Sequence, residues 1–249
     1  MEKTDIQYNT IEKNNAVGFD RDEIKNIRER FLKCTYSADI YDVLDSMGYP
    51  NQCLDHRIAP LLEKWKVCGP AVTLLGTREP MTEEERHPEP DYDKFWMFQH
   101  FYEGCVIIIN AEKEDNCGCW GEMMSYGSRN VGAAGVVIDG GTRDKAGILA
   151  IDSWSCFARY SSPVEAKKKW SPKEINHPIY MSGTLTSNVL VRPGDWIFGD
   201  SDAVIIIPKE IVIEVLKAVE DVSEREVLSR TAFQEGKTIQ EVFKLYSRA

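Results

Sequence analysis

The sequence predicts an α/β fold, a single domain of mixed sheets flanked by helices with helical extensions at both ends. Short apolar runs rich in β-branched residues alternate with longer segments whose apolar residues recur every three or four positions. The runs at residues 105–110 (CVIIIN) and 135–139 (GVVID) are almost wholly apolar, so both faces of their sheet should be covered. The length of 249 residues suits an N-terminal arm (1–19), one α/β domain (20–230) and a C-terminal helical tail (231–249).

The first half of the chain begins with two predicted helices. Apolar residues follow a helical period from residue 20 and again over residues 37–48, where Ser37 is the expected N-cap. A strand is expected over residues 67–76, and an aromatic helix over residues 92–103 follows after a loop rich in Glu and Pro.

The second half alternates strands and helices and ends in helices. One helix is expected from Gly121, and a shorter one is expected to run to Ile151. A further helix should start after Pro208 and be followed by an amphipathic tail. Between these helices, short strands are expected at residues 179–182, 189–191, 195–198 and 203–207.

The bulk composition argues against several classes of function. The formal net charge of -10 disfavours nucleic acid as a partner, because an acidic protein repels phosphate. The polar N-terminus, and the lack of an apolar run near the ~20 residues that span a bilayer, predict a cytoplasmic protein without membrane contact. The seven scattered cysteines are then expected as buried thiols. The sequence contains no GxGxxG turn, P-loop or GxSxG elbow.

Residues 139–144 (DGGTRD) present charge directly after a predicted buried strand. Ligands of open α/β sheets bind beyond the carboxyl ends of strands, and the two glycines permit a close approach of the backbone. Arg143 offers a planar fork of donors for a carboxylate or enolate oxygen, and Asp144 offers a hard oxygen ligand for Mg²⁺ or Mn²⁺. A structural Arg-Asp pair at a helix start explains the same residues, so both interpretations stay open.

The turn Gly121-Glu122-Met123-Met124 is a second candidate site. If a helix begins here, its free backbone N–H groups and its positive dipole end form a site for a small carboxylate. Glycine at the first position allows the ligand to approach closely. A helix start without a ligand is the simpler interpretation of this pattern taken alone.

These two segments lie within a wider resemblance to the RraA-like family, which includes 4-hydroxy-4-methyl-2-oxoglutarate aldolases and protein regulators of ribonuclease E. The resemblance covers most of residues 35–210 and implies the family's α/β domain, assembled as homotrimers or hexamers with sites near subunit interfaces. The matching stretches are residues 37–48 (SADIYDVLDSMG), 68–73 (CGPAVT), 120–124 (WGEMM), 132–144 (GAAGVVIDGGTRD) and 192–208 (RPGDWIFGDSDAVIIIP).

The resemblance also implies roles for individual residues. Backbone amides from Gly121 to Met124 should hold the carboxylate of a pyruvoyl group, and Arg143 should contact its keto or enolate oxygen. Asp144 should ligate the divalent cation, Mg²⁺ or Mn²⁺, with Glu122 holding a water molecule of that cation.

The activity implied by the resemblance is that of a metal-dependent class II pyruvate aldolase, a lyase that cleaves a 4-hydroxy-2-oxo acid to pyruvate. Oxaloacetate decarboxylation passes through the same enolate and is expected as a side activity. Two alternatives stay open: a non-catalytic protein-binding regulator of the ribonuclease E inhibitor type, and an enolate reaction on another 2-oxo acid. A glutamate of the C-terminal helix, Glu224 or Glu226, is a candidate for reaching a neighbouring subunit's site.

Two positions depart from the family's pattern. The metal-dependent aldolases of the family carry an acidic residue three positions after the aspartate, and this chain has Gly147 there. The outer shell of the cation is therefore expected to be weaker, or rebuilt from elsewhere. Residues 78–98 are longer and more aromatic than in the family, and are expected either to cap the pocket and alter substrate choice or to form plain surface.

Overall fold

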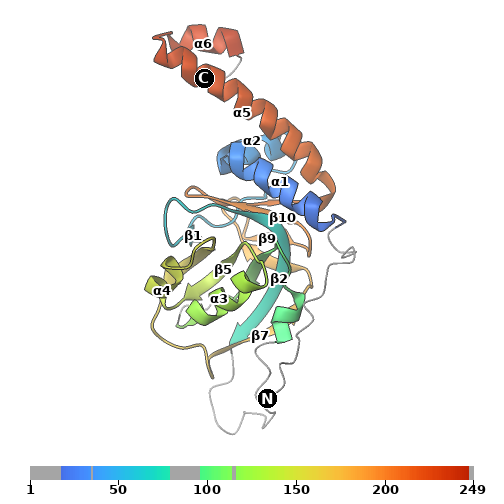
Figure 1. Ribbon diagram of the computed structural model, residues 1–249, viewed down its shortest axis with the longest axis vertical. Helices are drawn as coiled ribbons and strands as arrows, with labels where there is room; N and C mark the ends of the chain where they lie inside the picture. The colour runs from blue at the N-terminus through green and yellow to red at the C-terminus, as the bar shows by residue number, and fades with distance from the viewer. Residues whose placement is uncertain (1–17, 35, 79–95, 114–115, 247–249) are drawn as a thin grey trace.

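A computed structural model describes residues 18–34, 36–78, 96–113 and 116–246 of the chain, and shows a body of strands and helices from which the C-terminal helices project (Figure 1). The helices in chain order are α1 (Arg21–Cys34), α2 (Ser37–Ser46), η1 (Trp96–His100), α3 (Glu122–Asn130), α4 (Lys145–Leu149), η2 (Lys209–Ile211), α5 (Val212–Gln234) and α6 (Ile239–Tyr246). The strands are β1 (Ala59–Pro60), β2 (Val67–Arg78), β3 (Val106–Asn110), β4 (Gly118–Trp120), β5 (Gly135–Thr142), β6 (Ser155–Ser161), β7 (Trp170–Ile175), β8 (Ile179–Ser182), β9 (Asn188–Val191), β10 (Trp196–Gly199) and β11 (Val204–Ile207).

Nine strands of the described chain form one mixed sheet in the order β1-β6-β5-β3-β2-β10-β11, with β4 beside β5 and β7 beside β2. The central strands β2, β3, β5 and β6 run parallel, whereas β1, β7, β10 and β11 pair antiparallel with their neighbours. Cys53, which lies shortly before β1, forms an isolated antiparallel β-bridge with Ile205 of β11, the strand at the other end of the sheet. The sheet is therefore nearly closed on itself.

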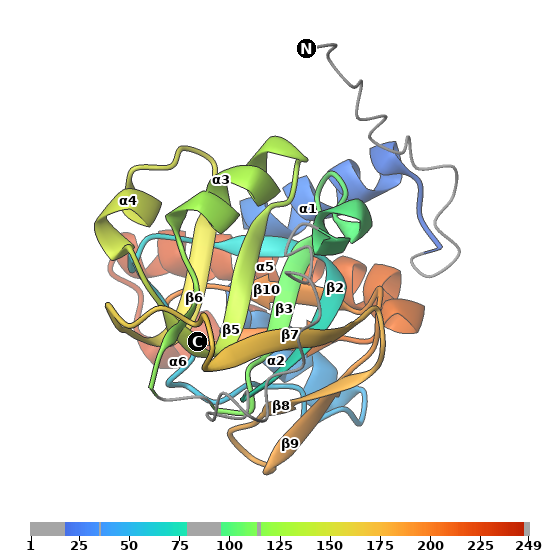
Figure 2. The same cartoon turned by 90° about the horizontal axis from the view of Figure 1, so that it is seen from below.

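Alternate residues of the central strands pack into two separate cores. In β3, Ile107 and Ile109 belong to the core shared with α1, α2 and α5, whereas Val106 and Ile108 belong to the core shared with the β8–β9 hairpin. All four side chains are fully buried. Figure 2 shows the parallel strands at the centre, with α3 and α4 on one side and the β8–β9 hairpin on the other. Because both faces of the sheet are covered, residues on both faces of these strands are apolar, which gives the continuous apolar runs in the sequence.

The largely buried guanidinium of Arg159 connects three segments of the body. It donates from Nε to Asp139, and its terminal nitrogens lie 3.3 Å from Oδ2 of Asp55. Asp139 also accepts a hydrogen bond of 2.7 Å from the backbone N–H of Ser182. Hydrogen bonds from Arg57, with the nearby charge of Arg159, hold the pKa of Asp55 well below its usual range. Asp139 is therefore a structural residue, although it begins the charged segment 139–144.

The predicted α/β class is confirmed, and every strand expected from the sequence is present. Four further strands, β1, β4, β6 and β7, have no clear sequence signal. Of these, β1 and β4 are too short to show a period, β6 carries Arg159 and two serines, and β7 contains Pro172. Short or polar strands of this kind form because their neighbours in the sheet supply hydrogen-bonding partners.

Three expectations about helices change in detail. The aromatic helix is a shorter 3₁₀ turn, η1, and residues 92–95 lie outside the described chain. Ser37 is not an N-cap but the first residue of α2, and its hydroxyl donates to Asp200 at 2.7 Å. The predicted N-terminal arm (1–19) lies mostly outside the described residues. The predicted boundary between the domain and the C-terminal tail, at residue 230, lies within α5, which continues unbroken across it. The division of the chain into units therefore stays a prediction.

Four of the six described cysteines, Cys68, Cys105, Cys117 and Cys156, are buried as expected, whereas Cys53 and Cys119 are partly exposed. Burial raises the pKa of Cys68, Cys105 and Cys156 to about 12, so these thiols stay protonated at neutral pH. Among the described helices, none combines the length and the hydropathy needed to cross a lipid bilayer.

Candidate functional site

Two neighbouring parallel strands bring the two candidate segments together. The strands β4 and β5 pair in parallel, with Trp120 opposite Thr142 at their carboxyl ends. Gly121 follows Trp120 at the edge of the sheet where Arg143 follows Thr142. The helices α3 and α4 then start beside each other (Figure 2). The residues that the sequence singles out in two separate places therefore lie at one site.

Hydrogen bonds around Trp120 fix the two segments relative to each other. The carbonyl oxygen of Trp120 accepts from the backbone N–H of Arg143 and from the hydroxyl of Thr142, both at 2.8 Å. The Trp120 indole donates to the Ser125 hydroxyl, which donates to the carbonyl of Gly121, both at 3.0 Å. Because Trp120, Ser125 and Thr142 are buried, water does not compete for these hydrogen bonds. The start of α3 is thereby held in a constant position beside Arg143.

The carboxylate of Asp144 points at the α3 turn. Asp144 has a left-handed backbone conformation, with φ 58° and ψ 37°, which is uncommon except for Gly, Asn and Asp. A Cβ atom added to Gly121 would lie 2.7 Å from Oδ2 of Asp144, and the N–H of Glu122 is 3.5 Å from the same oxygen. The predicted cation ligand thus faces the predicted carboxylate-binding turn and not the core.

Arg143 forms an ion pair with Asp144 in this structure. Its Nε lies 3.1 Å from Oδ2 and 3.3 Å from Oδ1, and the side chains are 32% and 40% exposed. The stem of Arg143 packs over Gly118, where an added Cβ would lie 2.7 Å from Cβ of Arg143. An ion pair this exposed contributes about 0–1 kcal/mol, so a ligand with its own anionic oxygen can compete for the guanidinium.

The N-terminus of α3 has no side-chain cap. Gly121 is the N-cap in an extended conformation, with φ -136° and ψ -172°. The N–H groups of Glu122, Met123 and Met124 have no acceptor within the helix, and the helix dipole favours an anion here. Because Gly121 has no side chain, Oδ2 of Asp144 and the stem of Arg143 can lie close to the start of α3.

The Glu122 carboxylate occupies the position that a side chain at residue 147 would take. A Cβ atom added to Gly147 would lie 2.5 Å from Oε2 and 2.8 Å from Oε1 of Glu122. Gly147 lies inside α4, where glycine costs about 1 kcal/mol relative to alanine. The acidic group missing at residue 147 is thus replaced in space by a carboxylate from α3. The sequence gives no signal of this exchange, because the two residues lie on different helices.

The carboxylates of Asp144 and Glu122 are the candidate ligands of a hydrated divalent cation. Within the described residues, no three His, Cys, Asp or Glu side chains form a group that could enclose a metal. Mg²⁺ is commonly held by one or two carboxylates, with water and substrate oxygens completing its shell. The partly exposed Asp144 carboxylate matches this kind of site and does not match a closed zinc site.

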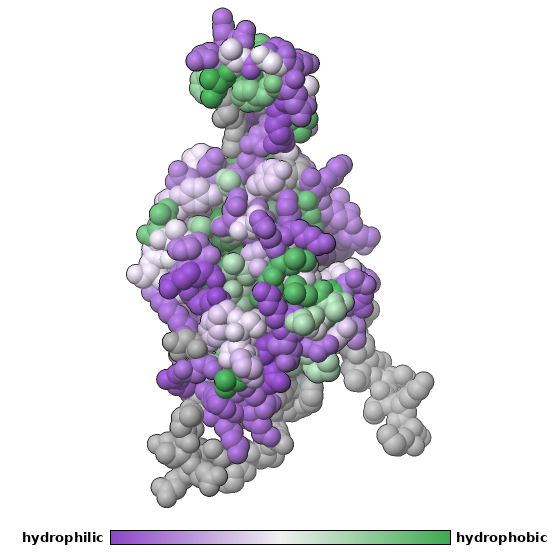
Figure 3. Space-filling view, turned by 90° about the vertical axis from the view of Figure 1, so that its left-hand side faces the viewer, coloured by the Kyte–Doolittle hydropathy of each residue, from purple (hydrophilic) through white to green (hydrophobic). Residues whose placement is uncertain are grey.

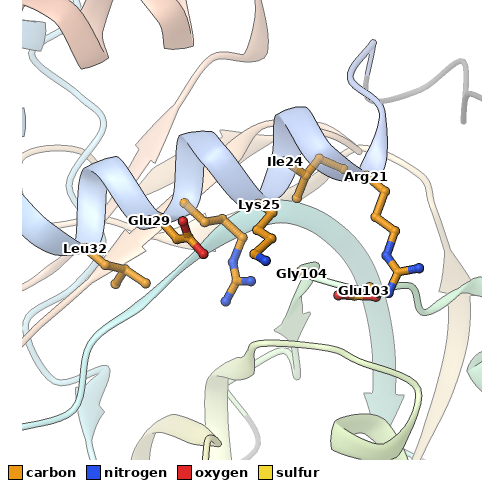
Figure 4. Close-up of a pocket in the computed structure, with 8 residues that line it drawn as sticks. Arg21, Ile24, Lys25, Glu29, Leu32, Glu103 and Gly104 are labelled. Carbon is orange, nitrogen blue, oxygen red and sulfur yellow. Dashed lines mark ion pairs between the residues drawn. The ribbon is translucent and has the colours of Figure 1, made fainter.

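A cavity of about 290 Å³ lies elsewhere, between α1 and the turn that precedes β3. Figure 4 shows Lys25 and Glu29 on one side of it and the ion pair of Arg21 with Glu103 at its end. Both signs of charge line this cavity, and none of the candidate residues does. The candidate site is an open one at the sheet edge.

Comparisons with known proteins place these residues in context. The model of the RraA-like family, described as Aldolase/RraA, matches residues 37–206. A protein of Halalkalibacterium halodurans with the provisional name 4-hydroxy-4-methyl-2-oxoglutarate aldolase is 33% identical over 173 residues, which are 68% of this chain and 71% of that protein. Protein DlpA of Legionella pneumophila is 25% identical over 240 residues, which are 96% of this chain and 36% of DlpA.

The solved structures include similar folds. RraAS2 of Streptomyces coelicolor, described as an unusual member of the RNase ES inhibitor RraA protein family, matches with a TM-score of 0.69 at 22% identity. The match covers 82% of this chain and 96% of that one. At this identity the likeness shows a shared fold. The chain also spans only about a third of DlpA, so what the whole of DlpA does is not carried over.

Proposed function

Because the chain belongs to the RraA-like family, we propose that it is a divalent-metal-dependent lyase that cleaves a 4-hydroxy-2-oxo acid to pyruvate. The family's description joins aldolases with RraA proteins, so the chain has an aldolase or an RraA-type role. The observation that favours the aldolase is the Asp144 carboxylate, which faces the uncapped start of α3 across Gly121. This arrangement presents a cation ligand and anion-binding donors to a single small ligand.

The proposed substrate matches these groups one by one. The carboxylate of the 2-oxo acid binds the N–H groups of Glu122, Met123 and Met124, and it replaces Oδ2 of Asp144, which accepts from the Glu122 N–H at 3.5 Å in the free protein. Its keto oxygen accepts from the guanidinium of Arg143, which turns away from Asp144 when the substrate binds. A divalent cation held by Asp144 supplies Lewis-acid stabilisation of the charge that develops on that oxygen.

The bond changes balance without a further reactant. The 4-hydroxyl group loses its proton, a carbonyl forms at C4, the C3–C4 bond breaks, and its electron pair moves into the pyruvate enolate. We assign the proton to a carboxylate oxygen of Glu122, since Asp144 is directed at Arg143 and Gly121. Protonation at C3 then yields pyruvate. Oxaloacetate decarboxylation passes through the same enolate and is proposed as a side activity.

A panel of 4-hydroxy-2-oxo acids together with oxaloacetate tests this proposal, with pyruvate measured by a coupled dehydrogenase. We expect pyruvate formation that requires Mg²⁺ or Mn²⁺ and stops when a chelator is added. If no member of the panel gives metal-dependent pyruvate, the lyase is rejected.

A non-catalytic regulator that binds a protein partner is the second candidate. The observation that favours it is the Arg143–Asp144 ion pair, which satisfies both side chains without a ligand. Capture of a ribonuclease, with no turnover of the panel, supports this candidate. Variants that abolish turnover distinguish the two, because loss of the Asp144 carboxylate should not affect a partner that binds another surface.

The Gly147→Ala variant tests whether Glu122 belongs to the cation site. The added Cβ displaces the Glu122 carboxylate, so we expect the affinity for Mn²⁺ to fall about 10-fold, the lower end of the range for an outer-shell partner. Stability should not fall, since alanine favours the helix. Mn²⁺ titration followed by electron paramagnetic resonance measures the affinity, with Ala146→Ser as the matched control. Unchanged affinity in Gly147→Ala would remove Glu122 from the site.

A further inference from the structure

The hydroxyl group of Ser125 connects the side chain of Trp120, on β4, to the main chain at the start of α3. It accepts a hydrogen bond from the Trp120 indole and donates one to the carbonyl oxygen of Gly121, both at 3.0 Å. Ser125 is fully buried and Trp120 is 2% exposed, so water cannot take the place of either partner. Loss of the hydroxyl would therefore leave the Trp120 indole without this partner in a dry environment.

The Trp120 indole fixes the direction in which the Ser125 hydroxyl donates. A serine hydroxyl both donates and accepts and can rotate, whereas an indole N–H only donates. Because the indole N–H points at the Ser125 oxygen, the Ser125 proton is directed to the Gly121 carbonyl, which also accepts from the backbone N–H of Ser125 at 3.1 Å. The indole packs in turn against Phe101, with 6.5 Å between the ring centroids. Two donors from Ser125 thus hold the Gly121 carbonyl.

A fixed carbonyl at Gly121 also fixes the N–H of Glu122, because the two groups belong to one peptide plane and point in opposite directions. Gly121 has no Cβ atom, so its own sterics restrict the rotation of this plane little. The Glu122 N–H lies 3.5 Å from Oδ2 of Asp144 and is one of the donors proposed above for the substrate carboxylate. Ser125 therefore orients a proposed ligand-binding donor without reaching the ligand itself.

Two other buried serines show what is particular to Ser125. Ser128, one turn later in α3, is fully buried, and its hydroxyl has no hydrogen-bond partner within the described residues. Ser229 of α5 donates to the carbonyl four residues earlier, that of Arg225, at 2.9 Å. A buried serine in a helix is thus compatible with either state. At Ser125 the acceptor is the N-cap residue Gly121, whose peptide plane carries the first N–H of α3.

This orienting hydroxyl lies in the interior, whereas the turn that it orients borders the surface. Figure 3 shows that the surface on the side where α4 lies in Figure 1 is largely hydrophilic. Met123, in the first turn of α3, is 69% exposed. A ligand can therefore reach this turn from the solvent while the hydrogen bonds of Ser125 stay intact.

We propose that Ser125 is a positioning residue that orients the Glu122 N–H toward the carboxylate of the 2-oxo acid, a role that rests on the lyase proposed above. The charge on this carboxylate does not change when the C3–C4 bond breaks. The hydrogen bond from Glu122 is therefore equally strong in the ground state and in the transition state, and loss of such uniform binding raises KM while kcat is unchanged. Ser125 determines how tightly the substrate is held and not how fast it is cleaved.

Steady-state kinetics of the Mn²⁺-loaded full chain test this role in the Ser125→Ala variant. We expect KM to rise about fivefold, the loss for one neutral hydrogen bond, with kcat and Mn²⁺ affinity at their wild-type values. The matched control is Ser128→Ala, the same change one turn later, which removes a hydroxyl without a partner and should alter neither constant. A purely structural role would lower the active fraction, so a fall in kcat with unchanged KM overturns the proposal.

The Trp120→Phe variant provides a second test, because it keeps a buried aromatic ring and removes the indole N–H. The Ser125 hydroxyl then keeps its acceptor but loses the donor that directs it. We expect KM to rise by less than in Ser125→Ala, again with unchanged kcat. If KM stays at the wild-type value in both variants, Ser125 does not orient the turn.

A wild-type protein that turns over no member of the panel rejects the lyase, and pyruvate binding then decides the role of Ser125. Isothermal titration of the Mn²⁺-loaded protein with pyruvate measures that binding. Affinity that falls in Ser125→Ala and not in Ser128→Ala supports the positioning role without the lyase. Equal affinity in the two variants, or a wild type that does not bind pyruvate, rejects the role.

Discussion

The Asp144→Ala variant is expected to lose metal-dependent pyruvate formation entirely, together with measurable Mn²⁺ binding at the site. Asp144 is the carboxylate that lies against Gly121 at the start of α3, and within the described residues no three-ligand group exists to hold the cation without it. Removing the ligand therefore removes both the cation and the stabilisation of the enolate. Isothermal titration with Mn²⁺ and the coupled pyruvate assay, performed on the same preparation, measure the two losses.

Alanine at this position also meets a backbone cost. A left-handed φ of 58° disfavours Ala by about 1–2 kcal/mol, so Asp144→Asn is the better-matched variant because asparagine tolerates that conformation. We expect Asn to retain the wild-type melting temperature and to lose the cation. Asp152→Ala, an exposed aspartate shortly after α4, serves as the control. Equal Mn²⁺ affinity in Asp144→Asn and wild type would show that the cation, if bound, is bound elsewhere.

Arg143→Lys is expected to separate binding of the cation from turnover. Lysine keeps a positive charge but loses the planar fork that contacts the keto oxygen, and loss of one such donor lowers kcat by about 100–1000-fold. Mn²⁺ affinity should stay the same or rise, because the guanidinium that lies 3.1 Å from Asp144 in the free protein is gone. Steady-state kinetics at saturating Mn²⁺, with the titration above, give both quantities.

A different kinetic result for Arg143→Lys would contradict the role assigned to Arg143. If KM rises while kcat is unchanged, Arg143 contributes only to binding and does not stabilise developing charge. Arg129→Lys at the end of α3 is a suitable control, since that side chain is exposed and donates to the carbonyl of Asp152. A large loss in the control as well would indicate a general weakening of α3.

The pattern of apolar residues was sufficient to predict the central strands of the sheet, but it was insufficient to predict the short strands at its edges. The apolar runs of β3 and β5 carry their own evidence, because residues buried on both faces must be apolar throughout. The strand β4 has three residues and exists because β5 offers it a partner. Without β4, the sequence cannot show that Gly121 and Arg143 are neighbours.

Part of the candidate site could likewise be predicted from the sequence, and part of it could not. Asp144, Arg143 and the Gly121 turn are recognisable from residue types at the ends of elements, whereas the packing of Glu122 against Gly147 depends on how α3 and α4 lie together. The effect of residues 79–95 on the site falls outside the described chain. The cytoplasmic location and the trimer or hexamer stay predictions.

The left-handed backbone at Asp144 restricts how this chain can change over evolutionary time. Only asparagine and glycine replace aspartate there at little cost in folding free energy, and both lack the carboxylate. A single-residue exchange can thus abolish the proposed lyase activity while every other surface keeps its shape. Descendants of such a chain are free to be selected for what they bind instead of what they cleave.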